Sequence, residues 1–339
     1  MVKKVYPNFH KSLMEESIYP SAKRRIKYEE TYHSYIYRAG DFIYKIRKPR
    51  ATEDNFALRE RYALEALDLG KHWAPDVVTR LMKLYKAQEG VYTFNEVGEP
   101  AEFVLQSVQV SENFWLSKQM EKGKFSPTAV GRLARFLAER HAERPAPDGG
   151  HEAGRPEQIQ GLAEEVFYQS KKYIGRIVPA PLLDMVSLPF FRFIEDHRKL
   201  FQRRQKKNRI VSCHGQFVPE HIYLKSREIF AISPLVGTQK YRNMDAANDL
   251  ATITNALQLA GDQESQELLI KRYATAARDR DLGVLMPLFQ TFQAIRMGLV
   301  LCEWLKEEGH SEEQRTEWTE KAHALYTLAG HRAARIGKS

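Results

Sequence analysis

The chain changes character near residue 110, and this change limits its possible folds more than any other feature of the sequence. Before this point, "TYHSYIYRAGDFIYKIRK" from Thr31 to Lys48 holds two runs rich in aromatic and β-branched residues, separated by Ala39, Gly40 and Asp41. This pattern predicts a β-hairpin. The segment "NFALRERYALEALDLGKHW" has helical spacing, and three strand-like runs follow it: "VVTRLMKLY", "VYTFNEV" and "EFVLQSVQV". We therefore expect a five-stranded antiparallel sheet with one helix after its second strand.

From Asn113 onward the pattern is mainly helical. The segment "SPTAVGRLARFLAERHA" begins with a Ser-Pro start signal and carries its apolar residues on one face. Further helices are expected at about 158–175, 181–207, 245–260, 263–278, 284–307 and 311–335. The short runs "HIYL" and "EIFAIS", joined by "KSR", predict a hairpin within this helical half. The fold class is thus α+β, with a small sheet lobe at 1–110 and a helical lobe at 111–339.

The size and cysteine content of the chain narrow its class. With 339 residues, of which 43% are hydrophobic, it can bury the cores of two lobes. Cys213 and Cys302 are its two cysteines, which argues against a disulfide scaffold or a zinc finger. The apolar stretch "MGLVLCEWL" from Met297 is too short to span a bilayer. We expect a cytoplasmic protein without a membrane segment.

The net charge of +9 raises the possibility of a polyanionic partner such as nucleic acid. The densest basic run is "RKLFQRRQKKNR", from Arg198 to Arg209. Its interleaved Leu200 and Phe201 favour the end of a helix, where cations suit the helix C-terminus. A solvated helical face is the preferred interpretation, and a basic nucleic-acid-binding module remains an alternative.

Five motifs carry a family resemblance. "HGQFVPEHIYL" resembles the "HGDLHxGN" loop of aminoglycoside phosphotransferases, and "MDAANDLA" resembles the "DxxNDLA" segment of one uncharacterised bacterial branch of that protein-kinase-like superfamily. "ETYHSYIYRAGDFIYKIRKP" is similar to the "ETHxSxVFxxGxxxYKxKKP" opening of the same branch, which "RLARFLAERHA" and "WAPD" also match. The likeness runs in order from about Glu30 to Leu305 and implies a bilobal kinase-like fold.

The resemblance also marks the positions that carry the chemistry in this family, and all three have changed. Gln216 stands where an Asp orients the attacking hydroxyl or takes its proton, and a neutral amide cannot act as a base. His221 replaces an Asn that helps to hold magnesium, for which imidazole is a poor ligand. Ala231 is placed at the second metal position, where its methyl group binds no metal. We therefore expect no metal and no ordinary magnesium-dependent transfer.

Around these positions, the chain has the same residue types as the family motifs at His214, Gly215, Asp245, Asn248 and Asp249. By resemblance, Asp245 is expected to brace the loop through hydrogen bonds. Two substitutes for the lost groups stay open: a displaced carboxylate from Glu220 or Glu228, and a metal site at Cys213, His214 and His221. Both are disfavoured, the second because adjacent residues of a strand point to opposite faces, so Cys213 and His214 would not easily share one ion.

The first lobe is less altered. Lys45 occupies the place of the strand lysine that pairs with the nucleotide phosphates in this superfamily, and an exposed lysine on an edge strand is the other interpretation. By resemblance a helix glutamate should hold this lysine. Glu65 is our choice and Glu60 the reserve, although Ala66 could be the matching position, in which case the ion pair is lost.

Three functions follow from these residues. The first is a pseudokinase that binds a protein or a small anionic ligand without catalysis, expected to bind ATP at most weakly and without magnesium. The second is a divergent, active ATP-dependent phosphotransferase acting on a small hydroxylated substrate or a protein. The third is the basic nucleic-acid-binding module. The two lobes are expected to meet near 110–114, with a cleft lined by Lys45, Gln216, His221 and Ala231.

Overall fold

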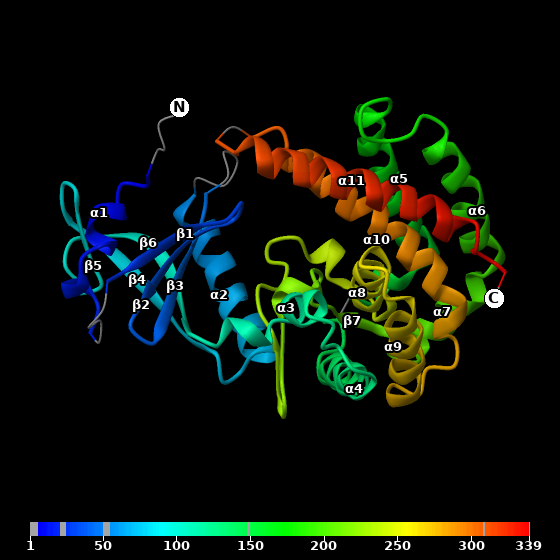
Figure 1. Ribbon diagram of the computed structural model, residues 1–339, viewed down its shortest axis with the longest axis horizontal. Coiled ribbons are helices and arrows are strands. Elements are labelled where there is room, and N and C mark those ends of the chain that lie inside the picture. Colours follow the sequence, from blue (N-terminus) through cyan, green and yellow to red (C-terminus); the bar gives the residue numbers. More distant parts are fainter. Residues whose placement is uncertain (1–5, 21–24, 50–54, 148–149, 308, 339) are drawn as a thin grey trace. The chain divides into compact units, whose positions relative to one another are not determined.

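The computed structural model describes residues 6–20, 25–49, 55–147, 150–307 and 309–338. These form two compact units (Figure 1). The first unit lies within Met1–Glu112 and also includes the short segment Ile232–Gly237. The second unit consists of Asn113–Ala231 and Thr238–Ser339. The sequence pattern gave no sign that Ile232–Gly237 packs with the first unit, because no periodicity marks so short a segment.

The first unit is built on a six-stranded antiparallel sheet in the order β1-β2-β3-β6-β4-β5. The strands are β1 (Lys27–Glu30), β2 (Ser34–Ala39), β3 (Phe42–Arg47), β4 (Val78–Gln88), β5 (Val91–Thr93) and β6 (Glu99–Val108). The sequence pattern predicted five strands and missed β1. That edge strand reads "KYEE" and has no buried residue, so no apolar alternation marks it. The helix α2 (Phe56–Trp73) consequently follows the third strand instead of the second.

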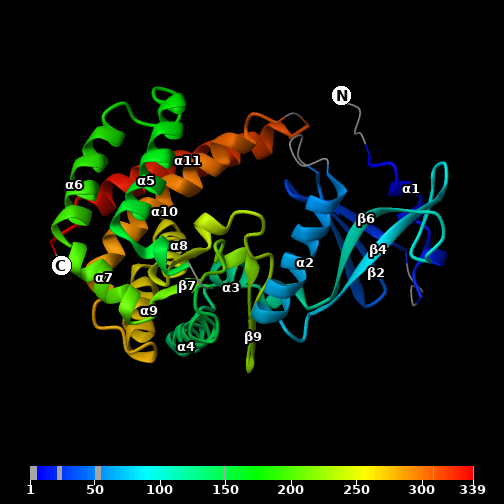
Figure 2. The same ribbon diagram turned by 180° about the vertical axis from the view of Figure 1, so that it is seen from behind.

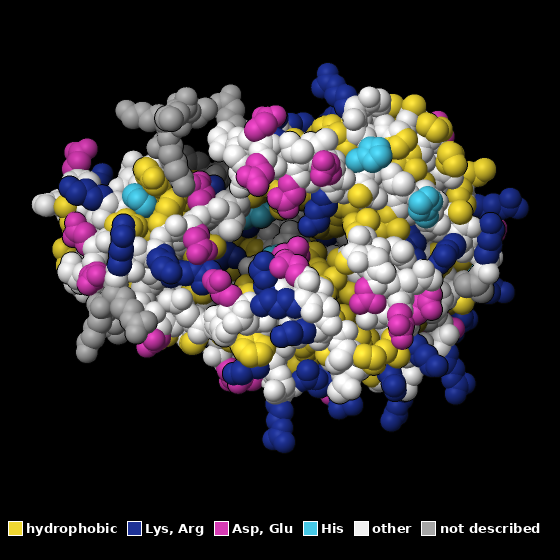
Figure 3. All heavy atoms as spheres, viewed as in Figure 1, with side chains coloured by type: hydrophobic (Ala, Val, Ile, Leu, Met, Phe, Trp, Pro, Cys, Tyr) yellow, Lys and Arg dark blue, Asp and Glu magenta, His cyan; other side chains and the backbone are white. Residues whose placement is uncertain are grey.

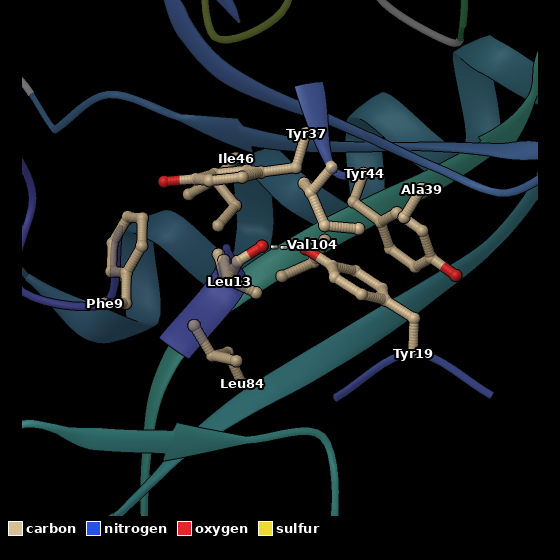
Figure 4. Close-up of a cluster of buried hydrophobic side chains, with 10 residues drawn as sticks. Phe9, Leu13, Tyr19, Tyr37, Ala39, Tyr44, Ile46, Leu84 and Val104 are labelled. Atoms are coloured by element: carbon tan, nitrogen blue, oxygen red, sulfur yellow. Dashed lines mark hydrogen bonds between the residues drawn. The ribbon is translucent and has the colours of Figure 1, made fainter. Parts of the chain in front are cut away.

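Helical segments cover both faces of this sheet. The short helices α1 (His10–Leu13) and η1 (Glu16–Ile18) lie on one face, where Leu13 joins a buried cluster with Tyr37, Tyr44 and Val104 (Figure 4). On the other face Phe103 packs against Phe56 of α2 at a ring separation of 4.8 Å. Since successive side chains of a strand point to opposite faces, Phe103 and Val104 place the two layers on opposite sides of β6.

The second unit is mainly helical. Its helices are α3 (Leu116–Glu121), α4 (Pro127–Glu143), α5 (Pro156–Ser170), α6 (Leu182–Asp196), α7 (Arg198–Lys206), α8 (Ala247–Leu259), α9 (Gln263–Ala276), α10 (Leu282–Trp304) and α11 (Glu312–Ala333). Short 3-10 helices lie at η2 (Glu112–Phe114), η3 (Gly150–Gly154), η4 (Lys171–Tyr173), η5 (Pro219–His221) and η6 (Gln239–Tyr241). The expected single helix at about 181–207 is two helices, which meet at His197.

Four short strands position the central loop of this unit. β7 (Ile210–Ser212) pairs antiparallel with β10 (Asn243–Asp245), and β8 (Ile222–Lys225) pairs antiparallel with β9 (Glu228–Ala231). The second pair is the hairpin that the sequence predicted. The loop "CHGQFVPEH" therefore begins at one strand pair and ends at the other.

The helix α10 contains the apolar stretch from Met297 and extends well beyond it. Its length and composition would suffice to cross a bilayer, yet 78% of its most apolar window is buried inside the structure. Figure 1 and Figure 2 both show it beside α11. Burial of this kind is typical of the core helix of a soluble protein.

The basic run forms α7, and much of its charge is neutralised locally. Arg204 is 1% exposed and forms ion pairs with Asp245 and Asp279. Arg203 binds Asp281 through two nitrogens, each 3.0 Å from a carboxylate oxygen. Basic and acidic side chains also lie next to one another on the face drawn in Figure 3. The run therefore forms a helix whose Arg203 and Arg204 are held in ion pairs, and it does not form a uniform cationic surface.

Candidate functional site

Asp249, near the start of α8, holds the loop that follows β7. Its carboxylate accepts the backbone N–H of His214 at 2.5 Å and that of Gly215 at 2.8 Å. Gly215 has a φ of 79°, a left-handed backbone that favours glycine. The "HG" and "NDLA" motifs thus meet through these two hydrogen bonds. Both His214 and Asp249 are fully buried, as expected of framework residues.

Behind Asp249 lies a second layer of buried polar groups. The Nε2 atom of His141 is 3.1 Å from the Asp249 carboxylate, and its Nδ1 atom is 2.8 Å from the hydroxyl of Tyr273. Burial disfavours ionisation of Asp249, but its hydrogen bond to His141 and the backbone N–H of Gly215 lower its pKa below the usual value. The loop is therefore held by an ionised carboxylate that is itself oriented by α4 and α9.

Asp245 contacts the beginning of the loop through its backbone, whereas its side chain is used elsewhere. Its carboxylate forms the ion pair with Arg204 and accepts the backbone N–H of Ala247 at 2.9 Å. Its contact with the beginning of the loop is made by its backbone, since the Cys213 thiol donates to its carbonyl oxygen at 3.7 Å. The side-chain brace of the loop is thus Asp249, while Asp245 joins α7 to the start of α8.

Arg296 of α10 supports the loop from its carbonyl side. Its Nη2 atom donates to the backbone oxygen of Gly215 at 2.7 Å, and its Nε atom donates to Gln293 at 3.0 Å. Its guanidinium also lies 5.2 Å from the ring centre of Tyr241. Burial lowers the pKa of Arg296. Sequence analysis missed this residue, although a single arginine within the apolar "QTFQAIRMGLVL" was a signal.

Gln216 and His221 lie close together in the loop. The Nδ1 atom of His221 is 3.0 Å from the backbone oxygen of Gln216 and donates a hydrogen bond to it. Neither side chain offers a carboxylate. Glu220 does, but it is exposed and pairs with Lys321 at 3.6 Å. These loop residues do not fit magnesium, which prefers carboxylate and other oxygen ligands.

Ala231 and Ser233 lie at the end of the second hairpin, and their surroundings differ. Ala231 is fully buried in β9, where it pairs with Ile222. Ser233 lies in the segment that packs with the first unit, and its hydroxyl is 2.9 Å from Nζ of Lys45. The polar side chain that the structure brings to Lys45 is therefore Ser233, two residues beyond the position chosen from the sequence.

The structure does not bring the expected glutamate to Lys45. Glu65 accepts the backbone N–H of Gly237 at 3.0 Å, and Glu60 lies 3.4 Å from Lys83. Within the described part of the chain, no carboxylate forms an ion pair with Lys45. Burial and the neighbouring Arg47 lower the pKa of Lys45 to about 8. Glu65 therefore binds the Ile232–Gly237 segment and does not pair with Lys45.

One group of side chains has the spacing of a metal site. His141, Cys213 and Asp249 are all buried, and their ligand atoms lie within 4.8 Å of one another. Burial raises the pKa of the Cys213 thiol well above its usual value. The Cys213 sulfur lies 3.8 Å from the backbone oxygen of Met244 and 3.7 Å from that of Asp245, and Asp249 accepts the backbone N–H of His214, so the group belongs to a hydrogen-bonded core.

Comparison with known proteins supports the fold. No protein-family model and no curated protein matches the sequence. A choline kinase from Cryptosporidium parvum Iowa II has a similar structure, with a TM-score of 0.56 at 11% identity over 95% of this chain and 94% of that one. An aminoglycoside 2'-phosphotransferase in its GDP complex has a TM-score of 0.51 at 16% identity over 98% and 99%. A putative aminoglycoside phosphotransferase from Ralstonia eutropha has a TM-score of 0.51 at 12% identity over 94% and 95%.

These likenesses confirm the fold that the motifs predicted. The chain has the bilobal kinase-like fold, with a small antiparallel sheet and a mainly helical second part. More specifically, it has the fold of the aminoglycoside phosphotransferases and choline kinases. At identities of 16% or less, this agreement concerns the fold alone.

Proposed function

We propose that this chain is a nucleotide-binding protein with a kinase-like fold that does not carry out ordinary magnesium-dependent phosphoryl transfer. The observation that carries this proposal is the contrast within the loop. Its framework is complete, with His214, Gly215, Asp249 and Arg296 joined by hydrogen bonds. Its reactive positions offer an amide at Gln216 and an imidazole at His221.

Nucleotide binding would depend mainly on Lys45. As an ammonium, it offers a point charge to phosphate oxygens. The residue beside it is the neutral Ser233, and no carboxylate among the described residues forms an ion pair with Lys45. Affinity should consequently be weak and nearly independent of magnesium. A protein or a small anionic ligand in the cytoplasm is the partner that we propose for such a module.

An active phosphotransferase is the second candidate, and two observations favour it. The solved structures with a similar fold include a choline kinase, an aminoglycoside 2'-phosphotransferase and a putative aminoglycoside phosphotransferase. The bracing of the loop is also intact, which an enzyme would require. This candidate needs a base and a metal ligand from groups other than Gln216 and His221. The nucleic-acid alternative rests on the net charge of +9, since ion pairs occupy Arg203 and Arg204 within the densest basic run.

Calorimetry and a transfer assay separate these functions. ATP is titrated into the purified protein with magnesium and with a chelator, and phosphate transfer is measured against a panel of amino alcohols and aminoglycosides. Weak binding that survives chelation, without turnover, supports the proposal. Tight binding that requires magnesium, or transfer to any acceptor, would favour the enzyme. No binding by either the protein or its Lys45→Arg variant would remove the nucleotide from the proposal.

A further inference from the structure

Lys45 and Ser233 form an isolated polar pair in the first unit. Nζ of Lys45 lies 2.9 Å from Oγ of Ser233. Among the described residues, this hydroxyl is the one hydrogen-bond partner of the lysine amine. A neutral hydroxyl stabilises the charge of an ammonium less than a carboxylate does. The pair therefore favours a lysine that can lose its proton.

The backbone holds Ser233 in a rare conformation. Its φ is 57°, in the left-handed region that residues other than glycine seldom adopt. The segment that carries it is fixed at its other end, where the N–H of Gly237 donates to Glu65 of α2. A strained residue that its surroundings hold in place is a frequent feature of functional sites. The Ser233 hydroxyl is thus aimed at Lys45 by the fold of the chain.

We propose that Ser233 and Lys45 form a nucleophilic dyad that accepts an acyl group from an activated ester. Nucleophile and base lie within hydrogen-bond reach, which is the geometry that such catalysis requires. Both side chains are partly exposed, so a small electrophile can reach them. The pKa of about 8 at Lys45 leaves a fraction of neutral amine near neutral pH.

The step is balanced by one proton transfer. Oγ of Ser233 forms a bond to the carbonyl carbon of the ester, and its proton passes to Nζ of Lys45. The bond from that carbon to the alcohol oxygen then breaks, and Lys45 returns the proton to the departing oxygen. The products are an acyl-serine and an alcohol, and nothing is oxidised or reduced.

The chemistry of the base points to an acyl group and not to a phosphoryl group. A polyphosphate beside Lys45 would stabilise the ammonium and thereby remove the base. An uncharged carbonyl compound leaves the amine free to accept the proton of Ser233. The dyad does not depend on the nucleotide site proposed above, and a nucleotide bound at Lys45 should compete with acylation.

The test uses p-nitrophenyl acetate as the probe on the full chain. Release of p-nitrophenolate is followed by absorbance, and the acetyl group is located by mass spectrometry of peptides. We expect acetylation of Ser233 and its loss in Ser233→Ala. Lys45→Arg keeps a charge and a donor but cannot act as a base, so its rate should fall about 100-fold. Lys45→Gln repeats this test if the arginine variant does not fold.

Ser226 provides the matched control. It is also a serine with positive φ, at 36°, but it lies in the exposed turn between β8 and β9. Ser226→Ala should keep the full rate. Acetylation of Lys45 itself, acetylation of Ser226, or equal rates in the parent and in folded Lys45→Arg would each overturn the dyad. ATP binding measured separately in Ser233→Ala, which retains Lys45, distinguishes failure of the dyad from failure of the nucleotide proposal.

Discussion

The loop of the second unit and the lysine of the first unit differ in what supports them. In the loop, the supporting contacts are buried: Asp249 accepts two backbone N–H groups, whereas the partly exposed Gln216 offers no carboxylate. Around Lys45, a serine hydroxyl faces the amine and Glu65 binds Gly237. This comparison shows that the loss of stability caused by substituting a side chain depends on how deeply that side chain is buried.

The energetic reason is the penalty for unpaired polar groups. Asp249 is fully buried and connected to His141, so its loss would leave several donors without acceptors. Gln216 and His221 are partly exposed, and water can satisfy whatever stands there. The shape of the loop therefore depends on the buried Asp249 more than on the side chains of Gln216 and His221.

The largest expected effect tests the buried framework through Arg204. Arg204→Met leaves the buried carboxylate of Asp245 without its cation and leaves Asp279 with the more distant Arg209 at 3.8 Å, which should lower the free energy of unfolding by about 3–5 kcal/mol. The control is Arg203→Met, one residue earlier in α7, whose ion pair with Asp281 is partly exposed and should contribute at most about 1 kcal/mol. Urea unfolding of both variants measures the difference, and equal losses would contradict a special role for the buried pair.

A second pair of variants compares the two positions at the end of β9. Ala231→Asp places a carboxylate at a fully buried site and should cost about 3 kcal/mol of stability. Ser233→Asp instead places it beside Lys45, where it should raise the pKa of the lysine and add an oxygen ligand for magnesium. Calorimetry with ATP should detect a gain of magnesium dependence in Ser233→Asp. If Ala231→Asp shows this gain and Ser233→Asp does not, then Ala231 and not Ser233 is the residue that lies beside the bound nucleotide.

Asp249→Asn tests whether charge or shape holds the loop. The amide preserves the size of the side chain but weakens acceptance of the two N–H groups, so stability should fall by about 1–3 kcal/mol. Because the folded-state pKa of Asp249 is lowered, its stabilisation is present above pH about 4 and is lost as the pH falls through the folded pKa. Urea unfolding between pH 3 and 7 should show a smaller acid-induced loss in the variant than in the parent.

The smallest expected effect concerns Lys45. Its folded pKa of about 8 lies below the usual lysine value, so between these two values the unfolded chain binds more protons than the folded chain. Stability from this residue should rise as the pH increases from about 8 toward 10. In Lys45→Met this contribution is absent, so the parent should lose stability relative to the variant as the pH falls from about 10 to about 8. An unchanged pH profile would mean that Lys45 is not desolvated.

Local patterns sufficed for much of the fold. The hairpin before residue 48, α2, the helical second half and the β8–β9 hairpin all follow from periodicity and turn residues. The motifs also marked the loop, since "HG" and "NDLA" contain the backbone glycine and the carboxylate that bind each other. Such features are readable because their cause lies within a few residues of the chain.

Other features were decided only by tertiary structure. The edge strand β1 has no apolar pattern, because it is a strand only through its pairing with β2. The sequence does not distinguish Arg204 from the other cations of its basic run. Its buried ion pairs with Asp245 and Asp279 appear only in the tertiary structure. Ser233 gained its partner because Ile232–Gly237 packs with a unit whose other residues end at Glu112. The sequence by itself determined the periodicity of the elements, the turns and the residue types of the loop. The ion pairs and the partner of Lys45 depend instead on contacts between residues far apart in the chain. Burial sets the energies of these contacts.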